Sequence, residues 1–354
     1  MKGIVLVTLE YPPQIGGVGR FYHRLVQLAT PVQSIDVLDN NHGQLLHPWI
    51  KAGLVLWRTL RSNDYTALII GQILPLGTVA ALLSYIWPGR LIIFTHGMDV
   101  LVPQRYWRKR LLMRWIVQRA DHIIAISHFT AQAIQQLVPS LPPTKISLLP
   151  PGPYITPEII TTQLIVDLPD QFMLSVGRLV ERKGFDRAIA AMASLSSKHN
   201  SVHYVIAGSG VDQARLASLA NTLGVSQRVH ILTELTDQYI AQLYSRCLFL
   251  VQPSRALANG DVEGFGMVVL EANTFSKPAI VGNSGGMPDT VVANHTGIIV
   301  DATAVSAISA AMEQLLNQPA YCQHLGQMAA RWVQQQHDWS AKVATLLKVC
   351  HDSD

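Results

Sequence analysis

Two glutamates bracket a glycine-containing turn and an apolar run in the C-terminal half of the chain. Residues 259–272 read NGDVEGFGMVVLEA, and the seven residues between Glu263 and Glu271 are all glycine or apolar. The glycines predict that a helix begins here, and its first backbone N–H groups can bind an anion or sugar oxygens. If both glutamates were helical, their side chains would lie ~80° apart around the axis. The spacing therefore favours two contacts along one elongated ligand over a single acid/base pair.

Two cations follow a buried apolar run at the start of the same half. Residues 174–184 read LSVGRLVERKG, which places Arg178 directly after Gly177 and Lys183 five residues later. A diphosphate requires charge-assisted hydrogen bonds from more than one direction, and two cations at the end of a strand provide them. The competing interpretation is two solvated surface charges. Together with the glycine loop described next, the pattern favours the diphosphate.

A glycine-rich loop follows the first apolar run near the N-terminus. Residues 10–21 read EYPPQIGGVGRF, so Gly16 and Gly17 lie between a predicted strand and a predicted helix. Such glycines let backbone N–H groups approach a phosphate or a sugar closely. A dinucleotide-binding fingerprint is disfavoured, because Tyr22 stands where its third glycine is needed.

Strand-like apolar runs alternate with helical stretches along the chain, with a Pro/Gly-rich break at residues 150–153. This alternation predicts parallel sheets covered by helices, with ligands beyond the carboxyl ends of the strands. We predict an α/β protein of two Rossmann-like, doubly wound domains that face each other across a cleft. The first domain covers residues 1–155, with a C-terminal helix of about residues 339–354 packed back on it, and the second covers residues 165–338. The predicted strands are residues 4–9, 34–38, 67–70, 91–95, 122–126, 145–149, 172–176, 203–207, 229–232, 248–252, 278–281 and 297–300.

Length and composition agree with this organisation. The chain has 354 residues, enough for two domains, and 49% of them are hydrophobic. Its three cysteines form no CxxC pair, which argues against a disulfide framework or a zinc site. The N-terminal apolar run is too short for the core of a signal peptide. Residues 66–89 carry no charge and are long enough to span a membrane, but glycine and proline divide them into a predicted strand and a buried helix over residues 76–87.

Positive charge is concentrated in the first half of the chain. Residues 1–150 contain 14 Lys and Arg against 6 Asp and Glu, a net charge of +8, whereas the remainder has a net charge of −4. This asymmetry is compatible with an anionic partner, such as a phosphorylated acceptor or a membrane surface. The charge count alone favours that interpretation only weakly over ordinary surface variation. Residues 105–115, RYWRKRLLMRW, could dock on an anionic membrane. The alternative, a helix whose Trp107, Leu111 and Trp115 pack inward, is slightly favoured because the charges do not fall on one face.

The chain resembles the retaining glycosyltransferases of glycosyltransferase family 4, which have the GT-B fold. The motifs occur in order and span nearly the whole chain. The DVEGFG motif and the short length resemble phosphatidylinositol mannosyltransferases and lipopolysaccharide- or polysaccharide-assembly glycosyltransferases. The matching stretches are EYPPQIGGVGRF (10–21), THGMDV (95–100), AISHFT (125–130), LPPG (149–152), SVGRLVERKG (175–184), VIAGSG (205–210), QPS (252–254), DVEGFGMVVLEA (261–272) and SGGMPD (284–289).

The resemblance implies a reaction and a set of catalytic residues. A hexose would move, with retention of configuration, from GDP-mannose or a UDP-hexose to a lipid-linked, polysaccharide or small anionic acceptor. Arg178 and Lys183 match the residues that hold the donor's diphosphate and stabilise the leaving group. Glu263 matches a carboxylate near the donor sugar, and His96 matches a histidine beside the reacting sugar. The nucleoside diphosphate would depart through an oxocarbenium-like state, with attack from the same face. Neither a metal nor another cofactor is expected.

Further positions match the family's binding residues. Glu271 matches the glutamate that binds the ribose hydroxyls of the nucleotide, and Gly16 and Gly17 would approach the phosphate or the acceptor. The donor- and nucleotide-binding positions implied in this way are Gly16, Gly17, Gly177, Phe265, Gly266, Met267 and Glu271.

Three departures from the family pattern leave part of the specificity open. Leu248 lies in a strand where members carry an aspartate, Thr233 replaces a glycine near the base, and Gly71-Gln72 replaces histidines. Two other classes remain: a nucleotide-sugar epimerase of the same fold, and a donor-binding protein without transfer activity. A cytoplasmic location is expected, either free or peripheral on the inner face of the membrane, with no nucleic-acid partner.

Overall fold

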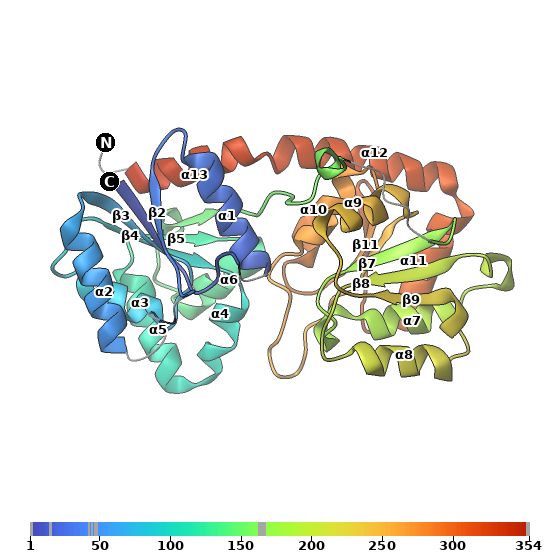
Figure 1. The fold of residues 1–354 in the computed structure, drawn as a ribbon. Helices are drawn as coiled ribbons and strands as arrows, with labels where there is room; N and C mark the ends of the chain where they lie inside the picture. The colour runs from blue at the N-terminus through green and yellow to red at the C-terminus, as the bar shows by residue number, and fades with distance from the viewer. Residues whose placement is uncertain are drawn as a thin grey trace. The chain divides into compact units, whose positions relative to one another are not determined.

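The structure is a computed structural model that describes residues 3–13, 16–41, 43, 45, 49–161 and 168–351 (Figure 1). It contains two compact units. The first consists of Met1–Gly152 together with Asp338–Asp354, and the second of Pro153–His337. Each unit has its own parallel sheet.

The first unit combines a six-stranded parallel sheet with helices. Its strands are β1 (Gly3–Val7), β2 (Ile35–Leu38), β3 (Tyr65–Ile70), β4 (Arg90–Thr95), β5 (His122–Ala125) and β6 (Ile146–Leu148). Its helices are α1 (Gly17–Ala29), α2 (Trp49–Ser62), α3 (Leu76–Leu83), α4 (Met98–Leu101), α5 (Trp107–Arg119), α6 (His128–Leu137) and α13 (Trp339–His351). The strand order is β2-β1-β3-β4-β5-β6. The chain's last helix, α13, packs against α1 and β3, which attaches it to this sheet (Figure 1).

The second unit has the same plan. Its strands are β7 (Phe172–Val176), β8 (His203–Ala207), β9 (Val229–Leu232), β10 (Leu250–Gln252), β11 (Ala279–Gly282) and β12 (Gly297–Val300). Its helices are α7 (Phe185–Ala193), α8 (Gln213–Thr222), α9 (Asp237–Arg246), α10 (Met267–Thr274), α11 (Val305–Asn317) and α12 (Pro319–Gln336). The strand order is β12-β11-β10-β7-β8-β9, so β7 and β10 are neighbours in the middle of the sheet.

Apolar side chains cover both faces of the second sheet. Successive residues of β7 point in opposite directions: Met173 packs in one buried cluster with α7, α8 and α11, and Leu174 packs in another with α9 and α10. Both are fully buried, and each such side chain contributes ~1.5–3 kcal/mol of transfer free energy. The two clusters fix the strands from both sides, so the loops at their carboxyl ends start from rigid positions.

The predicted α/β fold with two doubly wound sheets is confirmed. Each of the twelve predicted strands is present, with ends displaced by at most two residues. The uncharged residues 66–89 form β3 and α3, as predicted, although α3 ends at Leu83 and not at Trp87. Within the described residues, no helix combines the length and the apolar character needed to cross a membrane.

One expectation about α5 was wrong. Trp107 is 67% exposed and Leu111 is 57% exposed, so neither packs inward, and only Trp115 lies partly buried against the core. The reason is the spacing of the residues that do reach the core. Met113, Ile116 and Val117 form the buried stripe, with the i, i+3, i+4 spacing of one helix face. The N-terminal half of α5 lies before this stripe and remains exposed.

Candidate active site

Two cations and two carboxylates meet at the carboxyl-end loops of the second sheet. Lys183 and Arg182 belong to the short 3-10 helix η4 (Glu181–Lys183), which joins β7 to α7. The Lys183 Nζ lies 2.7 Å from Glu263 Oε2. The Arg182 Nε lies 3.4 Å from the same oxygen and 3.6 Å from Asp261 Oδ1. Both cations are buried, with 6% and 7% of the residue exposed.

This cluster keeps Glu263 ionised. Burial alone would raise the pKa of Glu263, but the charges of Lys183 and Arg182 and the hydrogen bond from Lys183 outweigh it. The pKa therefore lies below its ordinary value of 4.5. An ionised carboxylate can accept hydrogen bonds but cannot donate them. Glu263 is thus suited to accept from hydroxyl groups and unsuited to act as a general acid at neutral pH.

A glycine turn holds the backbone that carries Glu263. The N–H group of Gly286 donates to the Glu263 carbonyl at 2.9 Å. A Cβ atom at Gly286 would lie 2.0 Å from the carbonyl oxygen of Gly264, so no other residue fits there without displacing the backbone. The stretch SGGMPD (284–289), one of the stretches that match the family, therefore packs directly against the loop before α10.

The start of α10 lies just beyond Glu263. Gly266 is its N-cap residue with φ of 113°, and no side chain caps the helix. The first N–H groups of a helix have no intrahelical acceptor, and the dipole makes this end favourable for negative charge. Phe265 is buried, and Met267 is the first helical residue. These predicted sugar-binding amides therefore lie at a helix start, as expected from the two glycines.

Glu271 occupies the second turn of α10 and is only 4% exposed. Its Oε2 accepts a hydrogen bond of 2.9 Å from the Tyr244 hydroxyl, and its Oε1 accepts one of 3.4 Å from the Ile155 N–H. Tyr244, on α9, is a contact that the sequence analysis missed. A tyrosine on a neighbouring helix gives no sequence signal that connects it to a glutamate 27 residues later.

Arg178 lies at the edge of this cluster. It follows Gly177, whose φ is 142°, directly after β7, and its side chain is exposed. Its charge makes the smallest of the three cationic contributions to the lowered pKa of Glu263. The structure thus brings Lys183 and Glu263 into contact, adds Arg182, and leaves Arg178 in solvent beside them. Arg182 was missed because the sequence ERK gives no sign of which charge turns inward.

In the first unit, His96 follows the carboxyl end of β4 and is enclosed by aromatic rings, including Phe94. Its Nε2 lies 2.6 Å from the Tyr22 hydroxyl, which also donates to the Gly71 carbonyl at 2.9 Å. Burial lowers the pKa of His96 to about 4. The imidazole is therefore neutral at physiological pH, and it can orient a hydroxyl without carrying charge.

The backbone around His96 is also fixed. Its N–H group donates to Asp99 Oδ1 at 2.8 Å, and burial raises the pKa of Asp99 to about 6. Elsewhere in this unit, Gly16 is the N-cap residue of α1 and Gly17 its first residue. A Cβ atom at Gly16 would lie 3.0 Å from Glu10 Oε2. The predicted glycine loop therefore does precede a helix, as phosphate- or sugar-binding loops do.

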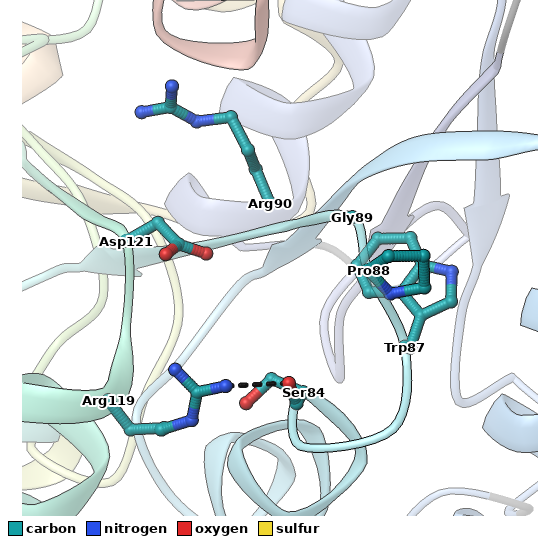
Figure 2. Close-up of a pocket in the computed structure, with 7 residues that line it drawn as sticks. All are labelled: Ser84, Trp87, Pro88, Gly89, Arg90, Arg119 and Asp121. Atoms are coloured by element: carbon teal, nitrogen blue, oxygen red, sulfur yellow. Dashed lines mark hydrogen bonds between the residues drawn. The ribbon is translucent and has the colours of Figure 1, made fainter. Parts of the chain in front are cut away.

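A pocket of about 270 Å³ lies elsewhere in the first unit (Figure 2). Two residues that line it are Arg90, the first residue of β4, and Asp121, which directly precedes β5; both lie at the amino ends of the strands, whereas His96 follows the carboxyl end of β4. Arg119 donates to the Ser84 carbonyl at 2.6 Å. Figure 2 shows the guanidinium of Arg90 directed away from Arg119 and Ser84. The charged groups do not converge on a common point, and ligands of such sheets bind at the carboxyl ends. We do not assign the chemistry to this pocket.

In the described part of the chain, no cluster of three or more His, Cys, Asp or Glu side chains is arranged to hold a metal ion.

Two protein-family models match the chain and identify its enzyme family. The model of the glycosyl transferases group 1 matches residues 158–332, and that of the glycosyl transferase 4-like domain matches residues 4–152. The chain belongs to the group 1 glycosyltransferases. The predicted family and the predicted enzyme class are therefore confirmed. The two matches correspond to the two compact units.

Relatives of this glycosyltransferase are similar over nearly their whole length. A GDP-mannose-dependent alpha-(1-6)-phosphatidylinositol monomannoside mannosyltransferase of Mycobacterium tuberculosis is 27% identical over 387 residues, covering 98% of both chains. The solved structure of sucrose-phosphate synthase from Thermosynechococcus elongatus is 20% identical, with a TM-score of 0.82 over 99% of this chain and 98% of that one. HepE of Anabaena, in complex with UDP, is 18% identical, with a TM-score of 0.78 over 98% of both chains. The structural matches establish the GT-B fold of this glycosyltransferase.

Proposed function

We propose that this glycosyltransferase moves a hexose from a nucleoside diphosphate sugar to a glycolipid or another anionic acceptor, with retention of configuration. The observation that carries the proposal is the contact of Lys183 with Glu263, beside Arg182 and the start of α10. Of the two donors expected, we place GDP-mannose before a UDP-hexose. The relative named for GDP-mannose is similar over 98% of both chains, whereas the likeness to the UDP complex concerns the fold.

The cations of the second unit account for donor binding. Lys183, with Arg182 beside it and Arg178 in solvent nearby, supplies positive charge at the carboxyl end of β7. A diphosphate carries several acceptor oxygens, and charge-assisted bonds to it are about twice as strong as neutral ones. In the structure the Glu263 carboxylate contacts the Lys183 ammonium at 2.7 Å. The donor's diphosphate would take over part of this contact when it binds.

The two glutamates would contact different parts of the donor. Glu263, held ionised, would accept hydrogen bonds from the hydroxyls of the sugar, while the N–H groups at the start of α10 would bind its oxygens. Glu271 lies four residues beyond Met267, which is ~6 Å along the helix axis. We propose that it binds the ribose hydroxyls and that Tyr244 holds its carboxylate in position. The two contacts would then fix the donor along its length.

Catalysis would rest on stabilising the leaving diphosphate. Each preorganised donor of this kind typically contributes ~10²–10³ in rate, and Lys183 would act on the charge that develops as the bond to the sugar breaks. The Lys183 ammonium sits on Glu263 Oε2, which makes this carboxylate a poor nucleophile. We therefore propose attack of the acceptor from the face that the diphosphate leaves, with the diphosphate taking the proton. The fixed cations would supply the positive charge, and we propose no metal requirement.

The donor is identified by binding measurements on the intact protein. We would compare GDP, UDP, ADP and their hexose conjugates by thermal shift and calorimetry, using wild type and Lys183→Ala. GDP at 100 times its Kd should stabilise wild type by ~2.7 kcal/mol, and Lys183→Ala should lose most of this effect. A preference for UDP would change the donor and leave the reaction class intact. If no nucleoside diphosphate binds, the proposal is wrong.

The N-terminal half of α5 is a candidate membrane-docking surface. The N-terminal half of α5 exposes Trp107 and Leu111 next to three exposed cations, Arg108, Lys109 and Arg110. Exposed aromatic residues with basic neighbours favour the surface of an anionic membrane, where each cation contributes ~1 kcal/mol. We propose that this half of α5 docks the enzyme on the cytoplasmic membrane face, where a glycolipid acceptor resides.

Vesicle binding tests this docking. Wild type should co-sediment with phosphatidylglycerol-rich vesicles at low salt and detach at high salt. The double variant Trp107→Ser/Leu111→Ser should lose this binding. The matched control is Leu82→Ser/Ile86→Ser, because these residues are similarly exposed, at 58% and 65%, but belong to the region of α3. Equal losses in both double variants, or no binding by wild type, would reject the docking role of α5.

A further inference from the structure

Arg255, in the loop after β10, makes several contacts with the segment that carries Lys183. Arg255 is buried, with 8% of the residue exposed, although it lies in a loop two residues from Pro253. Its guanidinium bonds both carboxylate oxygens of Asp186, at 2.7 and 3.1 Å. It also reaches Glu181 Oε1 at 3.4 Å. A bidentate arginine–carboxylate contact fixes orientation as well as distance.

These bonds span the 3-10 helix η4 from end to end. Glu181 is its first residue, and Asp186 lies in the first turn of the following helix, α7. The backbone N–H group of Arg255 donates to the Arg182 carbonyl at 2.8 Å, in the middle of η4. Arg255 therefore contacts the start and the middle of η4 and, through Asp186, the first turn of the helix that follows it.

The packing between the two loops leaves little room for adjustment. Gly184, with φ of 72°, follows Lys183, and a Cβ atom there would lie 2.0 Å from the carbonyl oxygen of Pro253. Farther along the second loop, Glu263 Oε2 lies 2.7 Å from the Lys183 ammonium. The loop after β10 thus approaches η4 and its C-cap residue Gly184 through Pro253, Arg255 and Glu263. Of these contacts, the bidentate pair with Asp186 fixes orientation as well as distance.

We infer that Arg255 and Asp186 are positioning residues that hold Lys183 where the donor's diphosphate binds. The inference rests on the proposed function. Neither residue is expected to touch the donor: Arg255 uses its guanidinium on Asp186 and Glu181, and acts on the ligand only through η4. A misplacement of a catalytic group by about 1 Å can cost ~10² in rate. A pair that served only to stabilise the fold would not act through Lys183 in this way.

A double-mutant cycle tests the dependence on Lys183. Arg255→Ala should lower kcat with the donor by ~10–100-fold, with an unchanged far-UV circular dichroism spectrum. In the Lys183→Ala background, the same replacement should cause almost no further loss, because residues that act as a unit are non-additive. Guanidinium ions in solution should partly restore Arg255→Ala and should not restore Lys183→Ala. Arg255→Lys keeps the charge but not the bidentate geometry and should show an intermediate kcat. If Arg255→Ala does not fold, Arg255→Lys replaces it in the double-mutant cycle.

Arg215→Gln is the matched control. Arg215 also approaches Asp186, at 3.7 Å, but it is 47% exposed and pairs mainly with Asp212 at 2.7 Å. This variant should retain wild-type kcat and donor KM. Additive losses in the cycle, or an equal loss in Arg215→Gln, would overturn the inference while leaving the proposed function in place. A wild type that neither transfers sugar nor binds a nucleoside diphosphate would overturn both.

Discussion

Replacing Glu263 by glutamine removes the charge shared by Lys183 and Arg182 while keeping the size of the side chain. The two cations lie 2.7 and 3.4 Å from Glu263 Oε2, and their side chains are 9% and 7% exposed. Removing one partner of a buried pair costs about 3–5 kcal/mol. Because the Glu263 side chain is 15% exposed and Asp261 still pairs with Arg182, we expect a loss of about 3 kcal/mol. In a unit of this size that corresponds to a decrease in Tm of ~6–12 °C.

The variant should also respond differently to pH and to ligand. The folded-state pKa of Glu263 is lowered, so its contribution is present above the ordinary value of 4.5 and is lost as pH falls through the folded value. The stability difference between wild type and Glu263→Gln should therefore shrink below pH 4.5. GDP should bind the variant about tenfold more tightly, a gain of ~1.4 kcal/mol, because the carboxylate no longer competes for Lys183.

Urea denaturation and calorimetry measure these effects. Asp261→Asn is the control, because Asp261 is 24% exposed and lies 3.6 Å from Arg182 alone. It should cost less than ~1 kcal/mol and leave GDP affinity nearly unchanged. If Glu263→Gln is as stable as wild type at pH 7 and binds GDP with wild-type affinity, the contact between Lys183 and Glu263 does not have the role assigned to it.

Three further replacements probe the other fixed groups. Tyr22→Phe should lower the free energy of unfolding by ~2–3 kcal/mol in urea, because it removes the hydroxyl that bonds the buried Gly71 carbonyl and lies 2.6 Å from the half-buried His96 Nε2; no loss would refute these contacts. Gly184→Ala should destabilise more than Gly224→Ala. Both glycines have φ near 70°, which costs alanine ~1–2 kcal/mol, but only at Gly184 would the Cβ atom meet a backbone oxygen, at 2.0 Å; equal Tm values would contradict this. Asp99→Asn should make stability fall as pH decreases from 6.5 to 4, by about 3 kcal/mol. In wild type two effects oppose each other: the pKa of His96, lowered to about 4, makes acidification destabilise the fold, and the pKa of Asp99, raised to about 6, makes acidification stabilise it. A similar pH dependence in both proteins would show that these groups do not titrate as described.

The positions of the strands could be predicted because they are short, apolar and bounded by turn residues. Residues of β3 and β4 are almost continuously buried, as expected for central parallel strands. The start of β10 could not be placed as well, since Leu248 and Phe249 are as apolar as the strand that follows them. Apolar character predicts burial and not hydrogen bonding, so strand ends were displaced by one or two residues.

The motifs indicated which loops carry the candidate site residues, but not how those residues pair. The glycines and charges of residues 175–184 and 261–272 indicated two ligand-binding loops. Nothing in their spacing indicated that Lys183 contacts Glu263, or that Arg182 turns inward beside it. The bidentate pair of Arg255 with Asp186 joins residues 69 positions apart. Contacts of this kind depend on the order of strands in the sheet, which places β10 beside β7, and a sequence pattern does not contain that order.

The exposed half of α5 shows a different limit. Apolar residues were expected to pack inward, because burial is their usual position. The helix is long enough that only its second half reaches the core, so Trp107 and Leu111 lie in solvent. A pattern of residue types gives the face of a helix that can be buried, but not how much of its length the rest of the fold covers.

The central claim is sugar transfer that depends on Lys183, and one measurement tests it most directly. Wild type and Lys183→Ala would be incubated with GDP-mannose and a phosphatidylinositol mannoside in detergent, with GDP release followed in time and the anomeric configuration of the product read by NMR. Wild type should release GDP and form a product with the configuration of the donor, and Lys183→Ala should form at least ~10²-fold less. Transfer by Lys183→Ala at the wild-type rate, or a product of inverted configuration, would contradict the account.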